Sequence, residues 1–129
     1  MTCALDASAI IAHLDPRDAH HTQATASLLG AAGERLVAHP LTLAECLVVA
    51  VRAGRGADVE EAIRQMGVTP TMVDGASPLR LAEMRVATGL RMPDCCALDA
   101  AVANDATLVT FDQRLAAAAR RFGIAVLPG

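Results

Sequence analysis

The sequence is poor in aromatic residues and contains no lysine. It has two Phe and no Trp or Tyr, so stacking of nucleic-acid bases on aromatic platforms is not an expected binding mode. All eleven cationic side chains are Arg, and the net charge is −3. The strongly basic surface typical of many nucleic-acid-binding proteins is therefore missing, and any active site that requires a lysine is excluded.

Long apolar runs and paired cysteines are also missing. The apolar run at residues 46–51 is far shorter than a membrane span, and the first residues, MTCALD, lack the basic start and apolar run of a signal peptide. The four cysteines show no CxxC spacing and stand in apolar surroundings, which is typical of reduced core thiols: Cys3, Cys46, Cys95 and Cys96. We expect a soluble cytoplasmic protein that does not contact membranes.

The chain has the length of one domain, residues 1–129, and 53% of its residues are hydrophobic. Short predicted strands alternate with predicted helices. The expected strands are 2–5, 36–39, 68–73, 107–110 and 124–127, and the expected helices are 7–14, 19–29, 40–53, 59–66, 78–88, 95–104 and 113–122. Such alternation predicts an α/β fold in which helices cover both faces of a parallel sheet.

Four acidic residues are predicted to meet at one edge of this sheet. Asp6 directly follows the first strand, and Asp112 follows the strand ending LVT. Asp94 opens the helix that leads into that strand, and the helix containing Glu45 starts from the same edge. Ligand sites of parallel sheets lie outside the carboxyl ends of the strands, so these carboxylates could converge on one site.

Helix capping is the plainer explanation for three of these acids. Asp6, Asp94 and Asp112 each precede a predicted helix, where Asp is a favoured N-cap worth about 1 kcal/mol. Glu45 lies inside its helix, in TLAECLVVAV, flanked on its face by Leu41, Thr42, Val48 and Val49. We therefore expect Glu45 to be buried and to need either an Arg or a metal ion as its partner.

A metal ion explains the gathering of acids better than an Arg does, because one Arg partner gives no reason for three further acids. Ligand sets made only of oxygen favour hard cations such as Mg²⁺ or Mn²⁺. The chemistry expected of such a site is phosphoryl transfer, with the ion neutralising charge on the phosphate oxygens.

Four segments resemble, in order, the signatures of PIN-domain nucleases, and most of all the VapC-like toxins of bacterial type II toxin-antitoxin pairs: LDASAIIAHL, LTLAECLVVAV, LRMPDCCALDAAVA and ATLVTFDQRL. The resemblance implies a three-layer α/β/α sandwich and a Mg²⁺- or Mn²⁺-dependent endoribonuclease. On matching positions, Asp6, Glu45, Asp94 and Asp112 would form the acidic quartet. Ser8 and Thr110 would support the metal site.

The resemblance also implies a homodimer and inhibition by a small cognate antitoxin that packs along a groove near the active site. Met66 and Met84 could serve such a surface, but filling gaps in the core is an equally good explanation.

Other polar residues have weaker assignments. Asp99 points about 140° away from Asp94 around the helix, so we expect a solvated or dimer-facing side chain. His20 and His21 are expected at the surface, with RNA contact as a minor alternative. Three Arg lie near the proposed edge in sequence and are candidate phosphate contacts: Arg17, Arg91 and Arg114.

Two other classes of protein share part of this pattern. A receiver-type signalling domain also carries acids at the edge of a parallel sheet, but its active site requires a lysine, which this chain lacks. A non-catalytic protein that binds metal for stability, or acts by blocking RNA, remains open. Metal-dependent turnover of RNA separates it from the nuclease.

Overall fold

Five parallel strands form one sheet in the computed structural model, which describes residues 1–128. The strand order is β3-β2-β1-β4-β5, so β1 lies at the centre between β2 and β4. The strands are β1 (Thr2–Leu5), β2 (Arg35–Ala38), β3 (Val68–Pro70), β4 (Thr107–Val109) and β5 (Val126–Leu127). Strands that are consecutive in the chain are joined through helical crossovers, as parallel strands require.

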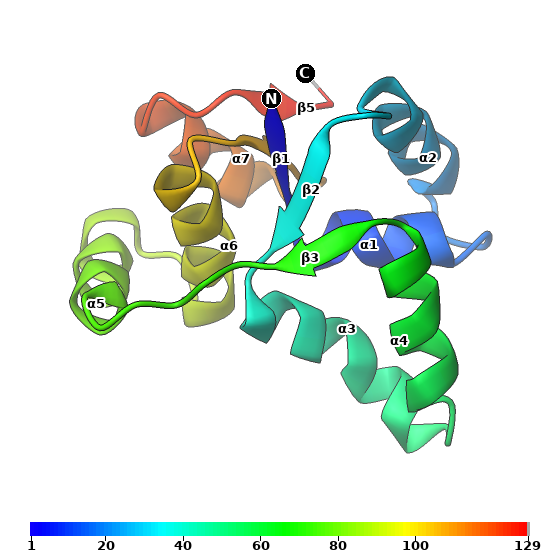
Figure 1. Ribbon diagram of the computed structural model, residues 1–129. Coiled ribbons are helices and arrows are strands. Elements are labelled where there is room, and N and C mark those ends of the chain that lie inside the picture. The colour runs from blue at the N-terminus through cyan, green and yellow to red at the C-terminus, as the bar shows by residue number, and fades with distance from the viewer. Residues whose placement is uncertain (129) are drawn as a thin grey trace.

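Seven helices occupy the crossovers within residues 1–128. They are α1 (Ala7–Leu14), α2 (His21–Gly30), α3 (Pro40–Arg52), α4 (Gly56–Gln65), α5 (Ser77–Thr88), α6 (Met92–Ala103) and α7 (Gln113–Arg121). Helices α1 to α4 cover one face of the sheet and α5 to α7 cover the other (Figure 1). The predicted α/β/α sandwich is confirmed.

The sheet contributes side chains to two separate cores, one on each face, because successive side chains of a strand point to opposite faces. Cys3 and Leu5 pack under α1 to α4, whereas Ala4, between them, packs under α5 to α7. In β4, Leu108 and Val109 divide in the same way. Small residues dominate where α6 and α7 meet the sheet, which allows the layers to approach closely without aromatic side chains.

Helix α6 begins three residues earlier than predicted. The sequence pattern indicated a start at Cys95, but Pro93 lies in the first turn, where proline is well tolerated, and the helix begins at Met92. Asp94 is therefore inside the first turn and is not an N-cap. Residues 95–101 of α6 are all buried, so this helix is the centre of its layer.

Asp99, expected to be solvated or to face a dimer partner, is buried, with 4% of its surface exposed. Its carboxylate accepts two hydrogen bonds from Arg80 of α5, from Nε at 3.0 Å and from Nη2 at 3.2 Å. Nη1 of Arg80 also reaches exposed Asp74 at 3.0 Å. Since Arg80 compensates the buried carboxylate, the pair joins α5 to α6 and stands apart from the acidic edge.

Met66 and Met84 pack against the two cores and do not form a partner surface. Met84 is buried between α5 and the sheet, and half-buried Met66 packs against the other core. Within the described residues, no helix combines the length and apolar character needed to cross a bilayer.

Replacing Arg80 with Met should lower the Tm by at least about 5 °C, because Asp99 would remain buried without its partner. Asp74→Asn is the matched control, since it removes only the exposed member of the cluster and should shift the Tm by about 1 °C or less. Thermal unfolding followed by circular dichroism compares the two. Equal, small shifts would show that the Arg80–Asp99 pair does not hold α5 in place.

Candidate functional site

Asp6 is fixed at the carboxyl end of the central strand by three hydrogen bonds. Its Oδ1 accepts from Ser8 Oγ at 2.7 Å and from the backbone N–H of Ala9 at 2.9 Å, and its Oδ2 accepts from Thr110 Oγ1. Asp6 is the N-cap of α1, so the capping explanation is correct for it. Capping also holds the carboxylate at the edge of the sheet, so the two roles are compatible.

Asp112 is held to the same network from the end of β4. Its Oδ1 accepts from the backbone N–H of Leu115 at 3.0 Å, as the N-cap of α7. Its own N–H donates to Thr110 Oγ1 at 3.0 Å, and the N–H of Phe111 donates to Ser8 Oγ at 3.0 Å. Ser8 and Thr110 thus connect the ends of β1 and β4, as supporting residues would.

The four predicted acids line one pocket of about 130 Å³ at this edge. Asp6 and Asp112 come from the ends of β1 and β4, Glu45 from α3 and Asp94 from α6. The remaining lining residues are Ala7, Ser8, Thr42, Arg91, Pro93 and Ala97. Residues separated by more than one hundred positions in the chain are therefore brought together by the sheet order.

Glu45 corrects a prediction, because it is exposed rather than buried. The buried face of α3 is formed by Thr42, Cys46 and Ala50. Two of the apolar residues that share a face with Glu45, Leu41 and Val48, are 42% and 45% exposed. The apolar surroundings of Glu45 are thus a surface strip on α3 and not a core.

Burial and mutual repulsion raise the pKa of three of the four carboxyls. The pKa of Asp6 is raised first by burial, against the three hydrogen bonds it accepts, and further by Asp112. The pKa of Asp94 is raised by burial and then by Asp112. The Glu45 side chain is exposed as a whole, but partial desolvation of its carboxyl, and then the charge of Asp94, raise its pKa. Such a group of carboxylates favours a bound cation.

The candidate phosphate contacts divide into two near the pocket and one outside it. Arg91 lines the pocket, with its Nε 3.7 Å from Oδ2 of Asp94. Arg114 is close enough to lower the pKa of Asp94. Arg17 does not line the pocket and pairs with Asp15 on the exposed loop after α1.

Thr42 is a site residue that sequence reasoning missed. Its side chain is 1% exposed, it lines the pocket, and its Oγ1 has no hydrogen-bond partner. A buried hydroxyl without a partner is unfavourable by about 1–3 kcal/mol. The sequence does contain a sign of this role, because Thr42 lies three residues before Glu45 and therefore on a neighbouring part of the same helix surface.

The residues present fit a hard divalent cation. The pocket offers carboxylate and hydroxyl oxygens, three carboxyls with raised pKa, and the unpartnered Oγ1 of Thr42. Among residues 1–128, no three His, Cys, Asp or Glu side chains lie close enough to form a complete ligand set. Mg²⁺ does not need such a set, since it keeps several waters and takes few direct protein ligands.

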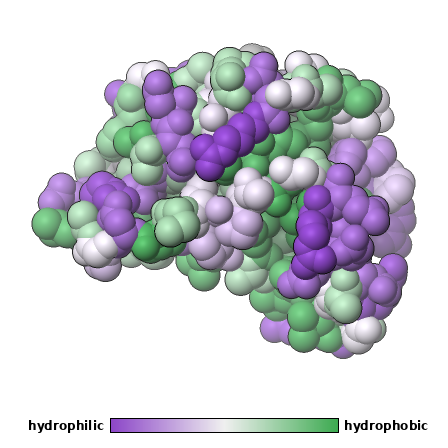
Figure 2. All heavy atoms as spheres, viewed as in Figure 1, coloured by the Kyte–Doolittle hydropathy of each residue, from purple (hydrophilic) through white to green (hydrophobic). Residues whose placement is uncertain are grey.

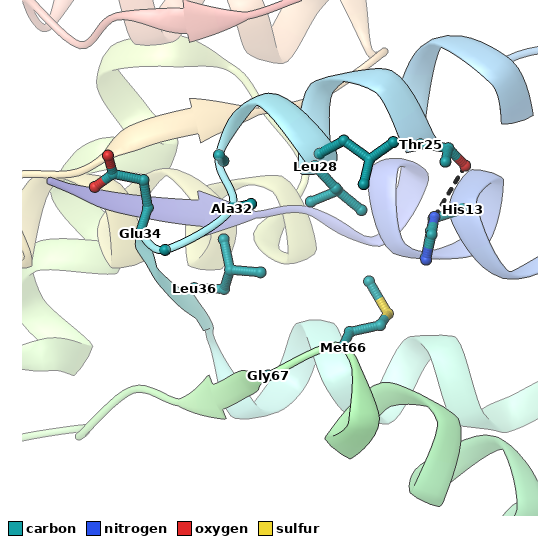
Figure 3. A pocket seen from close by; sticks show the side chains of 11 residues that line it. His13, Thr25, Leu28, Ala32, Glu34, Leu36, Met66 and Gly67 are labelled. Carbon is teal, nitrogen blue, oxygen red and sulfur yellow. Dashed lines mark hydrogen bonds between the residues drawn. The ribbon is translucent and has the colours of Figure 1, made fainter.

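A second cavity, of about 280 Å³, lies at the opposite edge of the sheet. His13, Leu28, Leu36 and Met66 line it, and His13 Nδ1 is 3.0 Å from Thr25 Oγ1 (Figure 3). This mainly apolar cavity lacks the convergent acids of the first pocket, so the chemistry is expected at the carboxyl edge.

Comparisons with known proteins agree with this fold. The family model of the PIN domain matches residues 3–121. The crystal structure of PAE2754 from Pyrobaculum aerophilum is similar to this chain, with a TM-score of 0.61 and 21% sequence identity, covering 98% of this chain and 92% of that one. At that identity the likeness shows the fold alone. No curated protein matches the sequence.

Asp94→Asn should raise the Tm by a few degrees at neutral pH in EDTA, because the pKa of Asp94 is raised in the folded protein. The folded state then holds a proton more tightly than the unfolded chain, so the parent gains stability as pH falls through the raised pKa. The parent gains no further stability below pH 3.8, the ordinary pKa of an aspartate, because the unfolded chain is then protonated as well. The advantage of the variant should therefore shrink with acidification. Thermal unfolding across pH measures it, and a less stable variant at neutral pH would contradict this electrostatic account.

Thr42→Val should weaken Mg²⁺ binding by about tenfold, since it removes a hydroxyl that can orient a ligand or water at the pocket. Without metal, the free energy of unfolding should rise by about 1–3 kcal/mol, because the variant no longer buries a hydroxyl that lacks a partner. Calorimetric titration and urea unfolding measure the two effects. Thr107→Val, at the far end of β4, is the control, and equal Mg²⁺ affinity in both variants would remove Thr42 from the site.

Proposed function

Since the chain belongs to the PIN-domain family, whose members are generally nucleases that bind Mg²⁺ or Mn²⁺, we propose that it is a metal-dependent endoribonuclease. The observation that carries the proposal is the convergence of Asp6, Glu45, Asp94 and Asp112 on one pocket. Four carboxylates around one space would repel an RNA backbone unless a cation lay between them.

The four carboxylates are the residues that would hold Mg²⁺ or Mn²⁺. When bound, the ion neutralises charge that develops on the phosphate oxygens and activates water as a nucleophile. Ser8 and Thr110 position Asp6 through their hydrogen bonds. Exposed Glu45 lies on the open side of the pocket, where it can adjust to the ion and to the incoming phosphate.

Substrate binding is assigned to the arginines at the pocket. Arg91 and Arg114 would contact phosphates close to the cleaved bond, because both lie near Asp94. Arg17 would reach a phosphate farther along the strand, since it is outside the pocket. Phosphate contacts of this kind position the RNA without reading its sequence.

A toxin role within a VapBC-like pair is the finer part of the proposal. It is supported by the exposed apolar strip on α3, where Val49 and Val51 are 71% and 63% exposed next to Leu41 and Val48. Beside it, a groove of about 380 Å³ runs between α3, α4 and β3. Figure 2 shows hydrophobic atoms at the surface of the lobe formed by α3 and α4. A cognate antitoxin segment and a second copy of the chain are the proposed occupants.

Cleavage of structured RNA by the purified protein tests the proposed activity. With Mg²⁺ or Mn²⁺ we expect cutting, with EDTA none, and with Asp94→Asn a loss of at least about 100-fold. Glu45→Gln should lower metal affinity and activity without unfolding the protein. A folded, metal-bound parent that leaves a broad set of RNAs intact would instead favour a non-catalytic, metal-binding PIN-like domain that acts by binding RNA or protein.

A further inference from the structure

The aromatic ring nearest to the acidic pocket in sequence is stacked. Phe111 lies between Thr110 and Asp112, and its ring stacks on the imidazole of His20, with ring centroids 4.6 Å apart and planes 12° from parallel. The low aromatic content argued against a stacking surface, but the fold brings together two rings that are ninety-one positions apart. We propose that this His20–Phe111 stack is a platform for a nucleobase of a single-stranded RNA segment.

The stack is held rigidly to the acidic pocket. The backbone N–H of Phe111 donates to Ser8 Oγ at 3.0 Å, and Ser8 Oγ donates to Asp6 Oδ1 at 2.7 Å. Two hydrogen bonds therefore join the ring-bearing residue to a proposed metal ligand. Because the next residue along the chain is Asp112, a base on the stack would belong to a nucleotide close to the reacting phosphate.

The loop that carries His20 is fixed from both sides. The backbone N–H of His20 donates to Asp18 Oδ1 at 2.8 Å, and Nδ1 of His21 hydrogen-bonds the carbonyl oxygen of Ala12 at 2.9 Å. His20 is exposed although Phe111 covers one face of its ring, whereas Phe111 is half-buried against the core. The open surface of the pair is thus the imidazole, supported from below by the benzyl ring.

A nucleobase fits this surface better than a phosphate does. Single-stranded bases stack on aromatic faces, including histidine, and the contact tolerates any base because every base has a π-face. Phosphates would be bound by Arg91 and Arg114, which lie near Asp94. The inference rests on the proposed ribonuclease function and adds to it that the substrate is unpaired beside the cleaved bond.

Binding of a short fluorescent single-stranded RNA, in a full-length Asp94→Asn background with Mg²⁺, tests the platform. His20→Ala should weaken binding about tenfold, His20→Phe should restore it because a ring is kept, and Gln23→Ala on the exposed side of α2 is the control. The slope of log Kd against log salt should not change in His20→Ala, since a stacking contact releases no counterions.

A set of RNAs with one abasic nucleotide at successive positions makes the test specific. At one position the missing base should weaken binding about tenfold to the background protein and by less than about twofold to His20→Ala. An equal penalty in both proteins at every position, or unchanged affinity in His20→Ala, overturns the platform. If the parent still cleaves RNA, the proposed function stands without it, whereas a parent that neither binds nor cleaves RNA overturns both.

Discussion

Repulsion among carboxylates at the carboxyl edge of the sheet is the constraint on which the site depends. Burial and the charge of Asp112 raise the pKa of Asp6 and of Asp94. The charges of Asp94 and Asp6 in turn raise the pKa of Glu45. Such an arrangement lowers the stability of the protein at neutral pH, so the rest of the structure must hold it together. The tight hydrogen bonding around Asp6, and the two helix caps made by Asp6 and Asp112, provide that restraint.

The fold supplies the restraint by placing β1 and β4 side by side at the centre of the sheet. The hydroxyls of Ser8 and Thr110 join the ends of the two strands, so their hydrogen bonds hold Asp6 next to the segment that carries Asp112. Asp94 is fixed by α6, whose buried turns pack on both neighbours of the layer and whose Asp99 is tied to α5 by Arg80. Glu45, on exposed α3, is the least restrained acid. Asp6, Asp94 and Asp112 are thus held by the fold, whereas Glu45 is the acid with the most freedom to move.

Features that depend on short stretches of sequence could be predicted. The alternation of strands with helices, the parallel sheet and the caps at Asp6 and Asp112 follow from apolar segments and their punctuation, whereas β3 and β5 are shorter than the predicted strands 68–73 and 124–127. Features that depend on residues far apart in the chain could not be predicted from the sequence. The apolar neighbours of Glu45 predict a core position, but they form a surface strip on α3. A surface strip and a core strip on a helix have the same sequence pattern. The ion pair of Asp99 with Arg80 and the stacking of His20 on Phe111 join residues that are far apart in sequence, so no local pattern predicts them.

Binding of Mn²⁺, followed by the loss of its free-ion electron paramagnetic resonance signal, tests the central claim most directly. The parent should bind the ion with an affinity that falls as acidification protonates the carboxylates, and Asp6→Asn should bind about tenfold or more weakly while remaining folded. Equal Mn²⁺ binding by the parent and Asp6→Asn, or none by a folded parent, would contradict the account of this edge as a cation site.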